Sequence, residues 1–145
     1  MTRDCVVDAS VGIKLFLVEE GSDAAHDLFG RLVAHPPGRL CVPDLFYAEC
    51  GNILWKYVRR FGYPVDRAQL AVRDLSALRL YTVSTADLLG KAVDLALARD
   101  VTVYDACYAV LAGQLDIPLV TADQTLRRNL TGSGIRVLDL AAPVL

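Results

Sequence analysis

The sequence has few of the residues that build most metal and nucleophilic sites. Its 145 residues include only two histidines, and its four cysteines are scattered without a C-x-x-C pair, so the ligand spacing of a structural zinc site is absent. Neither G-x-S-x-G, nor G-x-x-x-x-G-K-[ST], nor G-x-G-x-x-G occurs. The sequence therefore argues against zinc chemistry, against a serine hydrolase and against nucleotide binding by a glycine-rich loop.

Long hydrophobic runs and an excess of basic charge are also lacking. The longest uncharged run covers residues 106–115, well short of the ~18 residues that span a bilayer, and the apolar piece near the start is too short for a signal peptide. The net charge of −2 argues against nonspecific coating of nucleic acid, which depends on clustered Lys and Arg. We therefore expect a cytoplasmic protein without membrane association. Its hydrophobic content of 54% indicates a partner or self-association.

Strand-like and helix-like segments alternate along the chain. The apolar segments CVVD, RLCV, LYTVS, LVT and IRVLDL are typical of short buried strands. Helices are predicted over residues 10–18, from Ser22 as an N-cap, and over 45–60, 66–78, 86–99, 105–115 and DQTLRRN. Since no linker, repeat or low-complexity segment divides this alternation, residues 1–145 are predicted to form one α/β domain with a mainly parallel sheet flanked by helices.

Two of the predicted helices carry recurring apolar residues. In the helix after Ser22 they include Phe29 and Val33, and in the helix over 86–99 they are Leu89, Val93 and Leu97. Such spacing is typical of one helix face that packs on a core.

Single carboxylates stand where hydrophobic segments end. Asp8 ends the first strand, Asp123 follows LVT, and Asp105 starts a predicted helix. Because sites in open parallel sheets lie at the carboxyl ends of strands, these three acids could share one rim, although each could equally be a helix cap. Glu49 lies inside a helix at the margin of its buried face, and a buried carboxylate needs a partner. Asn52, three residues on, could hydrogen-bond near it.

Carboxylates that gather at one point favour a cation. Their mutual repulsion raises their pKa values unless a positive charge joins them. With hard oxygen ligands and no His or Cys nearby, the fitting ions are Mg²⁺ and Mn²⁺. Such ions bridge phosphate oxygens and lower the pKa of bound water. The implied chemistry is hydrolysis of a phosphate ester.

The ordered segments VVDAS, PDLFYAECGNIL and VYDACYAVLAGQLDIPLVTADQTL resemble the PIN-domain ribonucleases, and most closely the VapC toxins of bacterial toxin–antitoxin pairs. The resemblance covers nearly the whole chain and implies a PIN-like three-layer fold. It places the family's acidic quartet, and with it the metal-binding role, on Asp8, Glu49, Asp105 and Asp123.

Other positions of the motif match supporting residues or depart from the family pattern. Ser10 and Thr121 match small hydroxyls that support the site, and Asn52 matches a polar residue one turn after the glutamate. Asp44 stands where the family usually has a small or apolar residue beside its proline, and we interpret it as a cap of the long helix.

The resemblance also implies an activity. One or two Mg²⁺ or Mn²⁺ ions held by the quartet would orient a water for in-line attack on an RNA phosphodiester, leaving a 5′-phosphate and a 3′-hydroxyl. Asp8 and Asp105 would be direct ligands. Glu49 would ligate or act through a metal-bound water, and Asp123 would complete a second metal site or the outer shell.

The expected partners are RNA, an antitoxin and a second copy of the chain. The antitoxin segment would lie in a groove along the long helix, where Phe46, Trp55, Tyr57 and Phe61 occur. Because RNA must approach an acidic site on a protein of net charge −2, local cations should border the rim. Lys14, Arg127 and Arg128 are the candidates by position.

Three alternatives stay open at this point. The chain could be another PIN-type nuclease for RNA processing or for structured substrates, or a PIN-like binding module without catalysis. A phosphoaspartyl enzyme is less compatible, because it needs D-x-D after the first strand and Ser10 stands in place of the second Asp.

Overall fold

The computed structural model describes residues 4–141. In chain order its elements are β1 (Cys5–Val7), α1 (Ala9–Gly12), η1 (Ile13–Leu15), α2 (Ser22–Phe29), η2 (Gly30–Val33), β2 (Leu40–Pro43), α3 (Leu45–Phe61), α4 (Val65–Ala77), β3 (Tyr81–Val83), α5 (Thr85–Arg99), α6 (Val103–Leu115), β4 (Leu119–Thr121), α7 (Gln124–Asn129) and β5 (Val137–Asp139).

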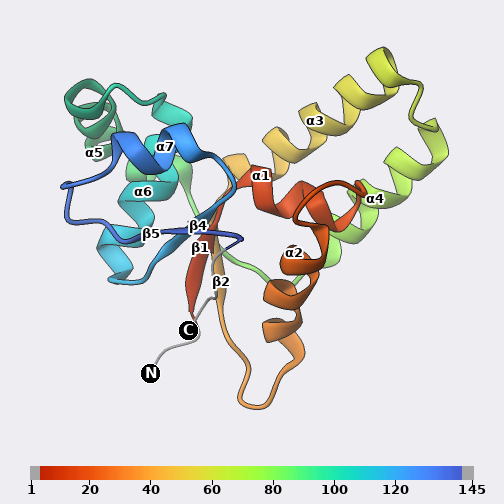
Figure 1. Cartoon of the computed structure of the whole chain (residues 1–145), viewed down its shortest axis with the longest axis horizontal. Coiled ribbons are helices and arrows are strands. Elements are labelled where there is room, and N and C mark those ends of the chain that lie inside the picture. Colours follow the sequence, from red (N-terminus) through yellow and green to blue (C-terminus); the bar gives the residue numbers. More distant parts are fainter. Residues whose placement is uncertain (1–3, 142–145) are drawn as a thin grey trace.

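The five strands form one sheet in the order β3-β2-β1-β4-β5, and every neighbouring pair is parallel. The central strands β1, β2 and β4 are fully buried, which explains their continuous apolar sequences. Helices α1 to α4 lie on one side of the sheet, and α5 to α7 lie on the other (Figure 1). The predicted α/β three-layer fold is therefore confirmed, with a sheet that is wholly rather than mainly parallel.

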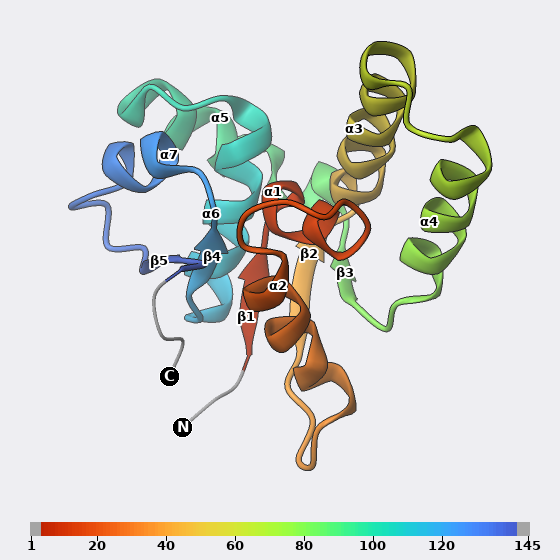
Figure 2. The same ribbon diagram turned by 45° about the vertical axis from the view of Figure 1, so that its right-hand side comes forward.

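Helices α3 and α4 form an arm that extends away from the sheet (Figures 1 and 2). Gly62 ends α3 in the left-handed conformation with φ 67°, and Pro64 directly precedes α4. The arm is anchored where α3 approaches α1, because a Cβ on Gly12 would lie 2.5 Å from the Phe46 ring. Only glycine permits this contact.

The segment after β1 differs from the single helix predicted over 10–18. Helix α1 ends at Gly12 and tightens into the 3₁₀ turn η1, and the amides of Phe16 and Leu17 both donate to the Ile13 carbonyl. Ser22 is not the N-cap of the next helix. Gly21 takes that position with φ 87°, while the Ser22 hydroxyl donates to the Leu17 carbonyl.

The predicted apolar stripes proved wrong in part. Val33 is 80% exposed. The α-helix gives way to the tighter 3₁₀ helix η2 at Gly30, and this change of helical twist turns the Val33 side chain away from the core. On α5 the buried face consists of Leu88, Ala92 and Ala96, where two alanines allow close packing on α6. The stripe Leu89, Val93 and Leu97 lies instead on the exposed face.

Asp44 does not cap the long helix that follows it. Strands β2 and β3 are neighbours, so α3 and α5 begin side by side. The Asp44 carboxylate accepts hydrogen bonds from the Thr85 amide (2.9 Å) and the Thr85 hydroxyl, at the start of α5. In return the Leu45 amide at the start of α3 donates to the Thr85 hydroxyl oxygen (3.2 Å). The two helices are therefore capped reciprocally.

Candidate active site

Two of the singled-out carboxylates follow the adjacent central strands. Asp8 comes directly after β1, and Asp123 lies two residues past β4. The strands pair in parallel through Val6–Leu119 and Val7–Val120. Both acids therefore lie at the same edge of the sheet, where sites in parallel sheets are found.

Asp8 is the most buried of the acids, with 4% exposure. Its Oδ1 accepts hydrogen bonds from the Ser10 hydroxyl and from the Val11 amide (3.2 Å), and its Oδ2 accepts one from the Thr121 hydroxyl. Burial, with a smaller contribution from the charge of Asp105, nevertheless raises the pKa of Asp8 to about 6 against the lowering effect of these hydrogen bonds. A carboxylate this well bonded is held rigidly at the end of β1.

Asp123 is exposed and is held by the start of α7. Its Oδ1 accepts hydrogen bonds from the amides of Thr125 (2.9 Å) and Leu126 (3.1 Å), which makes it the N-cap of that helix. Its own amide donates to the Thr121 hydroxyl oxygen (3.0 Å). Within residues 4–141, Asp123 Oδ2 accepts no hydrogen bond, so this oxygen is available to a ligand.

Asp105 lies in the first turn of α6 rather than at its start. Thr102 is the N-cap, and its hydroxyl oxygen accepts from the Asp105 amide (3.1 Å). The Asp105 side chain is half-buried. Burial and the charge of Asp123 both raise its pKa, while the Thr102 hydroxyl lowers it. The capping interpretation therefore holds for Asp8 and Asp123 but not for Asp105.

Glu49 reaches this region from α3. It is half-buried, and its Oε1 accepts a hydrogen bond of 2.6 Å from the Tyr108 hydroxyl of α6. Burial raises the pKa of Glu49; the Tyr108 hydrogen bond lowers it, and the charges of Asp105 and Asp8 raise it further. The four acids are thus neighbours, because each one acts electrostatically on at least one other.

Among residues 4–141, no cationic side chain pairs with this group of negative charges. In the described part of the chain, none of the ion pairs involves any of the four carboxylates. Nor do three His, Cys, Asp or Glu side chains come together there closely enough to form a metal site as they stand. The donor set itself, carboxylate and hydroxyl oxygens without sulfur or imidazole, fits Mg²⁺ or Mn²⁺.

The residues predicted to support the site have different positions. The Ser10 hydroxyl donates to Asp8 Oδ1, and the Thr121 hydroxyl donates to Asp8 Oδ2. The Ala122 amide donates to the Ser10 hydroxyl oxygen (3.2 Å), so these hydrogen bonds link the end of β1 to the end of β4. Asn52 is exposed, and its side chain makes no hydrogen bond within residues 4–141. The partner of Glu49 is instead Tyr108, which the sequence reasoning missed. The feature of the sequence that could have identified Tyr108 is its position one helical turn after Asp105 on α6.

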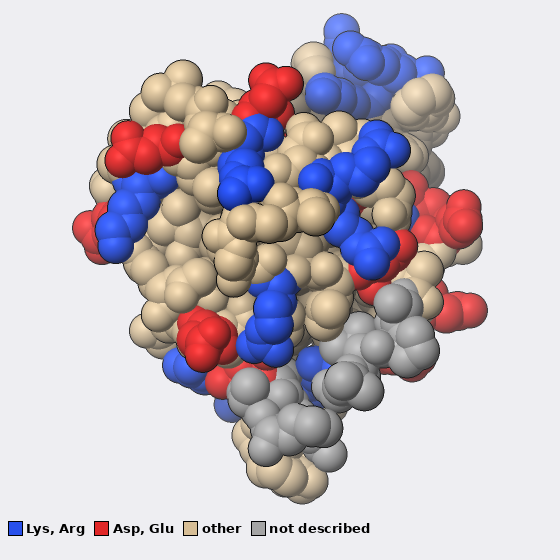
Figure 3. Space-filling model, turned by 60° about the vertical axis from the view of Figure 1, so that its left-hand side comes forward, with Lys and Arg blue, Asp and Glu red and all other residues tan. Residues whose placement is uncertain are grey.

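The predicted RNA-binding cations are partly engaged elsewhere. Lys14 Nζ lies 3.0 Å from Glu19 Oε1 and donates to the Glu20 carbonyl (2.7 Å). Arg127 is half-exposed and lies 3.9 Å from Asp139, whereas Arg128 donates to the hydroxyl of Thr125 (3.3 Å). On the side shown in Figure 3, Lys and Arg side chains form separate groups between neutral atoms rather than one continuous basic patch.

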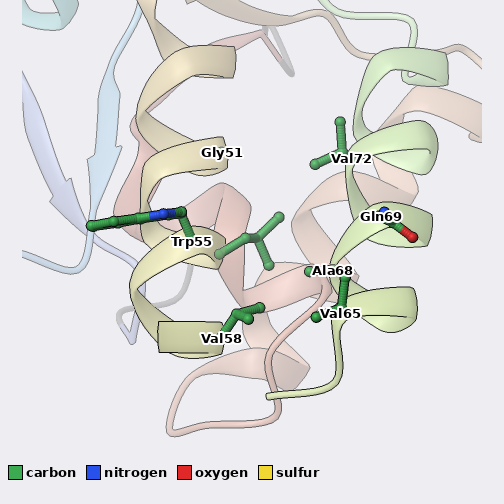
Figure 4. A pocket seen from close by; sticks show the side chains of 8 residues that line it. Gly51, Trp55, Val58, Val65, Ala68, Gln69 and Val72 are labelled. Carbon is green, nitrogen blue, oxygen red and sulfur yellow. The ribbon is translucent and has the colours of Figure 1, made fainter. Parts of the chain in front are cut away.

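A second feature is an apolar groove between α3 and α4, with a pocket of about 390 Å³. Its lining consists of Gly51, Leu54, Trp55, Val58, Val65, Ala68, Gln69 and Val72. Val58 of α3 and Val65 and Val72 of α4 point toward each other across this space, whereas the Trp55 ring points away from α4 (Figure 4). Of the aromatic residues expected there, only Trp55 lines the pocket. Phe46 is fully buried, and the Tyr57 hydroxyl donates to Glu19 Oε2 (3.2 Å).

The comparison with known families matches residues 5–129 to the PIN domain. This chain belongs to the PIN-domain family. It is 38% identical to Ribonuclease VapC3 of Pyrobaculum aerophilum over 125 residues, which cover 83% of this chain and 90% of that protein. Two solved structures share the PIN-domain fold. The crystal structure of PAE2754 from Pyrobaculum aerophilum has a TM-score of 0.70 and 27% identity and covers 94% of this chain and 83% of that one. A toxin–antitoxin complex from Klebsiella pneumoniae has a TM-score of 0.64 and 15% identity, with coverages of 96% and 99%.

The PIN-domain assignment agrees with the remaining features of the chain. Among residues 4–141, no helix is both long and apolar enough to cross a bilayer. All four cysteines are buried free thiols, and burial raises the pKa of Cys5 and Cys50 to about 12. They act as small hydrophobic side chains of the core.

Proposed function

We propose that the protein is a metal-dependent endoribonuclease, the toxin of a VapBC-type toxin–antitoxin pair. The observation that carries the proposal is the group of four neighbouring carboxylates at the carboxyl edge of the sheet, which form no ion pair within residues 4–141, in a chain similar to a ribonuclease. Mg²⁺ or Mn²⁺ would supply the charge that orients phosphate and acidifies the attacking water. The products would carry a 5′-phosphate and a 3′-hydroxyl.

The side chains of the four acids would position the divalent ion for this reaction. Asp8, fixed by two hydroxyls and an amide, provides a carboxylate that cannot rotate away. Asp105 and Glu49 approach from α6 and α3, and Asp123 leaves Oδ2 open beside them. Four negative charges would hold a divalent ion against the phosphate that it binds, and the rigid supports would limit the movement of the ligands.

The test is cleavage of labelled RNA by the purified chain. We expect cleavage with Mg²⁺ or Mn²⁺, none in excess EDTA, and a loss of at least about 100-fold in Asp8→Asn and Asp105→Asn. Thermal unfolding in EDTA should show both variants folded, since each substitution removes a repelling charge. Undiminished cleavage in chelator, or by both variants, would contradict the proposal.

We further propose that the α3–α4 groove binds a helical segment of an antitoxin. Its lining is apolar apart from Gln69, and it lies between the two helices of the arm. This is the arrangement that receives the apolar face of an amphipathic helix. A structural relative occurs as a toxin–antitoxin complex. A basic residue of the antitoxin would then reach the acidic rim and pair with its carboxylates.

The exposed face of α5 supports a homodimer. Leu97 is 82% exposed, and Leu89 and Val93 lie beside it on the same helix face. A continuous apolar stripe of this kind on a protein of the cytoplasm, the expected location, favours contact with a second copy. Light scattering at micromolar concentration should give the mass of a dimer, and Leu97→Glu should give that of a monomer.

A further inference from the structure

Tyr108 is a buried residue with a single polar contact. Its side chain is 1% exposed, and its hydroxyl donates to Glu49 Oε1 over 2.6 Å. The two residues are 59 positions apart and come from different helices, α6 and α3. Within residues 4–141 this is also the only hydrogen bond of the Glu49 carboxylate.

The position of Tyr108 distinguishes it from an ordinary core tyrosine. It lies three residues after Asp105, so both side chains project from the same face of α6. This face therefore supplies one carboxylate of the proposed site directly and orients a second one through the phenol. Glu49 Oε2 accepts no hydrogen bond in the described part of the chain and stays available.

The rotational freedom of Glu49 makes such an orientation necessary. A glutamate has a longer and more flexible side chain than an aspartate, and Glu49 is only half-buried. The other two supporting side chains, those of Ser10 and Thr121, contact Asp8 and not Glu49. Asn52, which stands one turn after Glu49, is exposed, and its side chain makes no hydrogen bond among the described residues.

We propose that Tyr108 is a positioning residue, which holds Oε1 of Glu49 by its hydroxyl so that Oε2 is presented to a divalent cation. This inference rests on the proposed function, because it assigns Tyr108 a part in the same site. The hydroxyl does not touch RNA or the cation in this arrangement. It acts through Glu49, because its hydrogen bond fixes the orientation of the carboxylate that would bind the cation.

The test compares two tyrosines that each donate to a glutamate. Tyr108→Phe removes the hydroxyl at the site, and Tyr57→Phe removes the matched hydrogen bond to Glu19 (3.2 Å) away from it. The affinity for Mn²⁺ is measured by titration calorimetry on the full chain, alongside thermal unfolding and RNA cleavage over a range of Mn²⁺ concentrations. We expect Mn²⁺ binding about 10-fold weaker in Tyr108→Phe, with cleavage that recovers as Mn²⁺ is raised. Tyr57→Phe should retain the wild-type Mn²⁺ affinity.

A double variant tests whether the effect passes through Glu49. Once Glu49→Ala has removed the carboxylate, adding Tyr108→Phe should weaken Mn²⁺ binding no further. Equal Mn²⁺ affinity in Tyr108→Phe and wild type, additive losses in the double variant, or an unfolded Tyr108→Phe would overturn the positioning role. Absence of Mn²⁺ binding and cleavage in the wild-type chain would instead overturn the proposed function, so the two failures are distinguishable.

Discussion

The acidic rim and the α3–α4 groove are built in opposite ways. The rim combines side chains from four separate parts of the chain, Asp8, Glu49, Asp105 and Asp123, and it exists only because β1, β4, α3 and α6 meet at one edge of the sheet. The groove is formed by two consecutive helices joined by Gly62, Tyr63 and Pro64. The proposed catalysis thus depends on long-range topology, whereas the proposed antitoxin binding depends on a local helical hairpin.

This difference implies that the two regions can be changed independently. The rim is polar, and its most buried acid, Asp8, is hydrogen-bonded through both oxygens at the end of a fully buried strand. The groove is apolar, and its side chains Trp55, Val65 and Val72 are all exposed. Substitutions in one region should leave the other intact, because α3 is the only described helix that contributes lining or ligand residues to both.

The largest expected effect separates catalysis from antitoxin binding. Val72→Glu places a charge in the apolar groove and should weaken antitoxin binding by about 30-fold or more, since a buried interface residue contributes about 2 kcal/mol. Its RNA cleavage should equal that of the wild type. Asp105→Asn should behave conversely, with cleavage lost and the antitoxin still bound. Titration of each variant with the co-purified partner, beside the cleavage assay, measures both quantities.

Leu97→Glu is the matched control for this comparison. It introduces the same charge on an exposed apolar side chain of α5, outside both regions. It should lower the mass in solution while antitoxin affinity per chain stays unchanged. If Val72→Glu and Leu97→Glu weakened the antitoxin equally, the groove would not be its binding site.

The sequence predicts the four acids of the rim better than it predicts side-chain packing around them. The alternation of strands and helices indicates that Asp8, Asp105 and Asp123 share one rim, and the apolar surroundings of Glu49 single out that acid too. The family resemblance then gives all four the metal-binding role. The sequence did not predict Tyr108 as the partner of Glu49, because the two side chains meet only in the folded protein, where α6 lies near α3. The face that α5 exposes was also missed, since Leu88 and Leu89 are both apolar and only the alanines of the buried face identify it.

A smaller effect follows from titration, which involves the rim alone because the groove lining has no ionisable side chain. In the metal-free protein the pKa of Asp8 is raised to about 6 from 3.8 by burial. Between these values the folded state binds more protons than the unfolded state. The contribution of Asp8 therefore favours folding at low pH and is lost as the pH rises through about 6.

Asp8→Asn should remove this dependence. In urea unfolding with EDTA, the variant should be more stable than the wild type by up to ~3 kcal/mol at pH 7.5, with the difference vanishing near pH 4. Asp44 provides the control, since hydrogen bonds from Thr85 lower rather than raise the pKa of its carboxyl. A wild-type advantage over Asp8→Asn that grows with pH would contradict the raised pKa.

The smallest expected effect concerns the cations predicted beside the rim, and here the structure reverses the order that the sequence favoured, in which Lys14 came first by position. Lys14 has little exposure and already bonds Glu19 and the Glu20 carbonyl, whereas Arg127 is half-exposed and only 3.9 Å from Asp139. Arg127→Ala should therefore weaken binding of all RNAs alike and reduce the salt slope by about 0.7, the value for one phosphate contact on a single strand. Lys14→Ala should mainly reduce stability, by about 1 kcal/mol, with little change in that slope. Because a phosphate contact positions the RNA without reading its sequence, an Arg127→Ala effect confined to one RNA would assign Arg127 to base recognition instead. An unchanged salt slope in both variants would place the RNA path on another part of the surface.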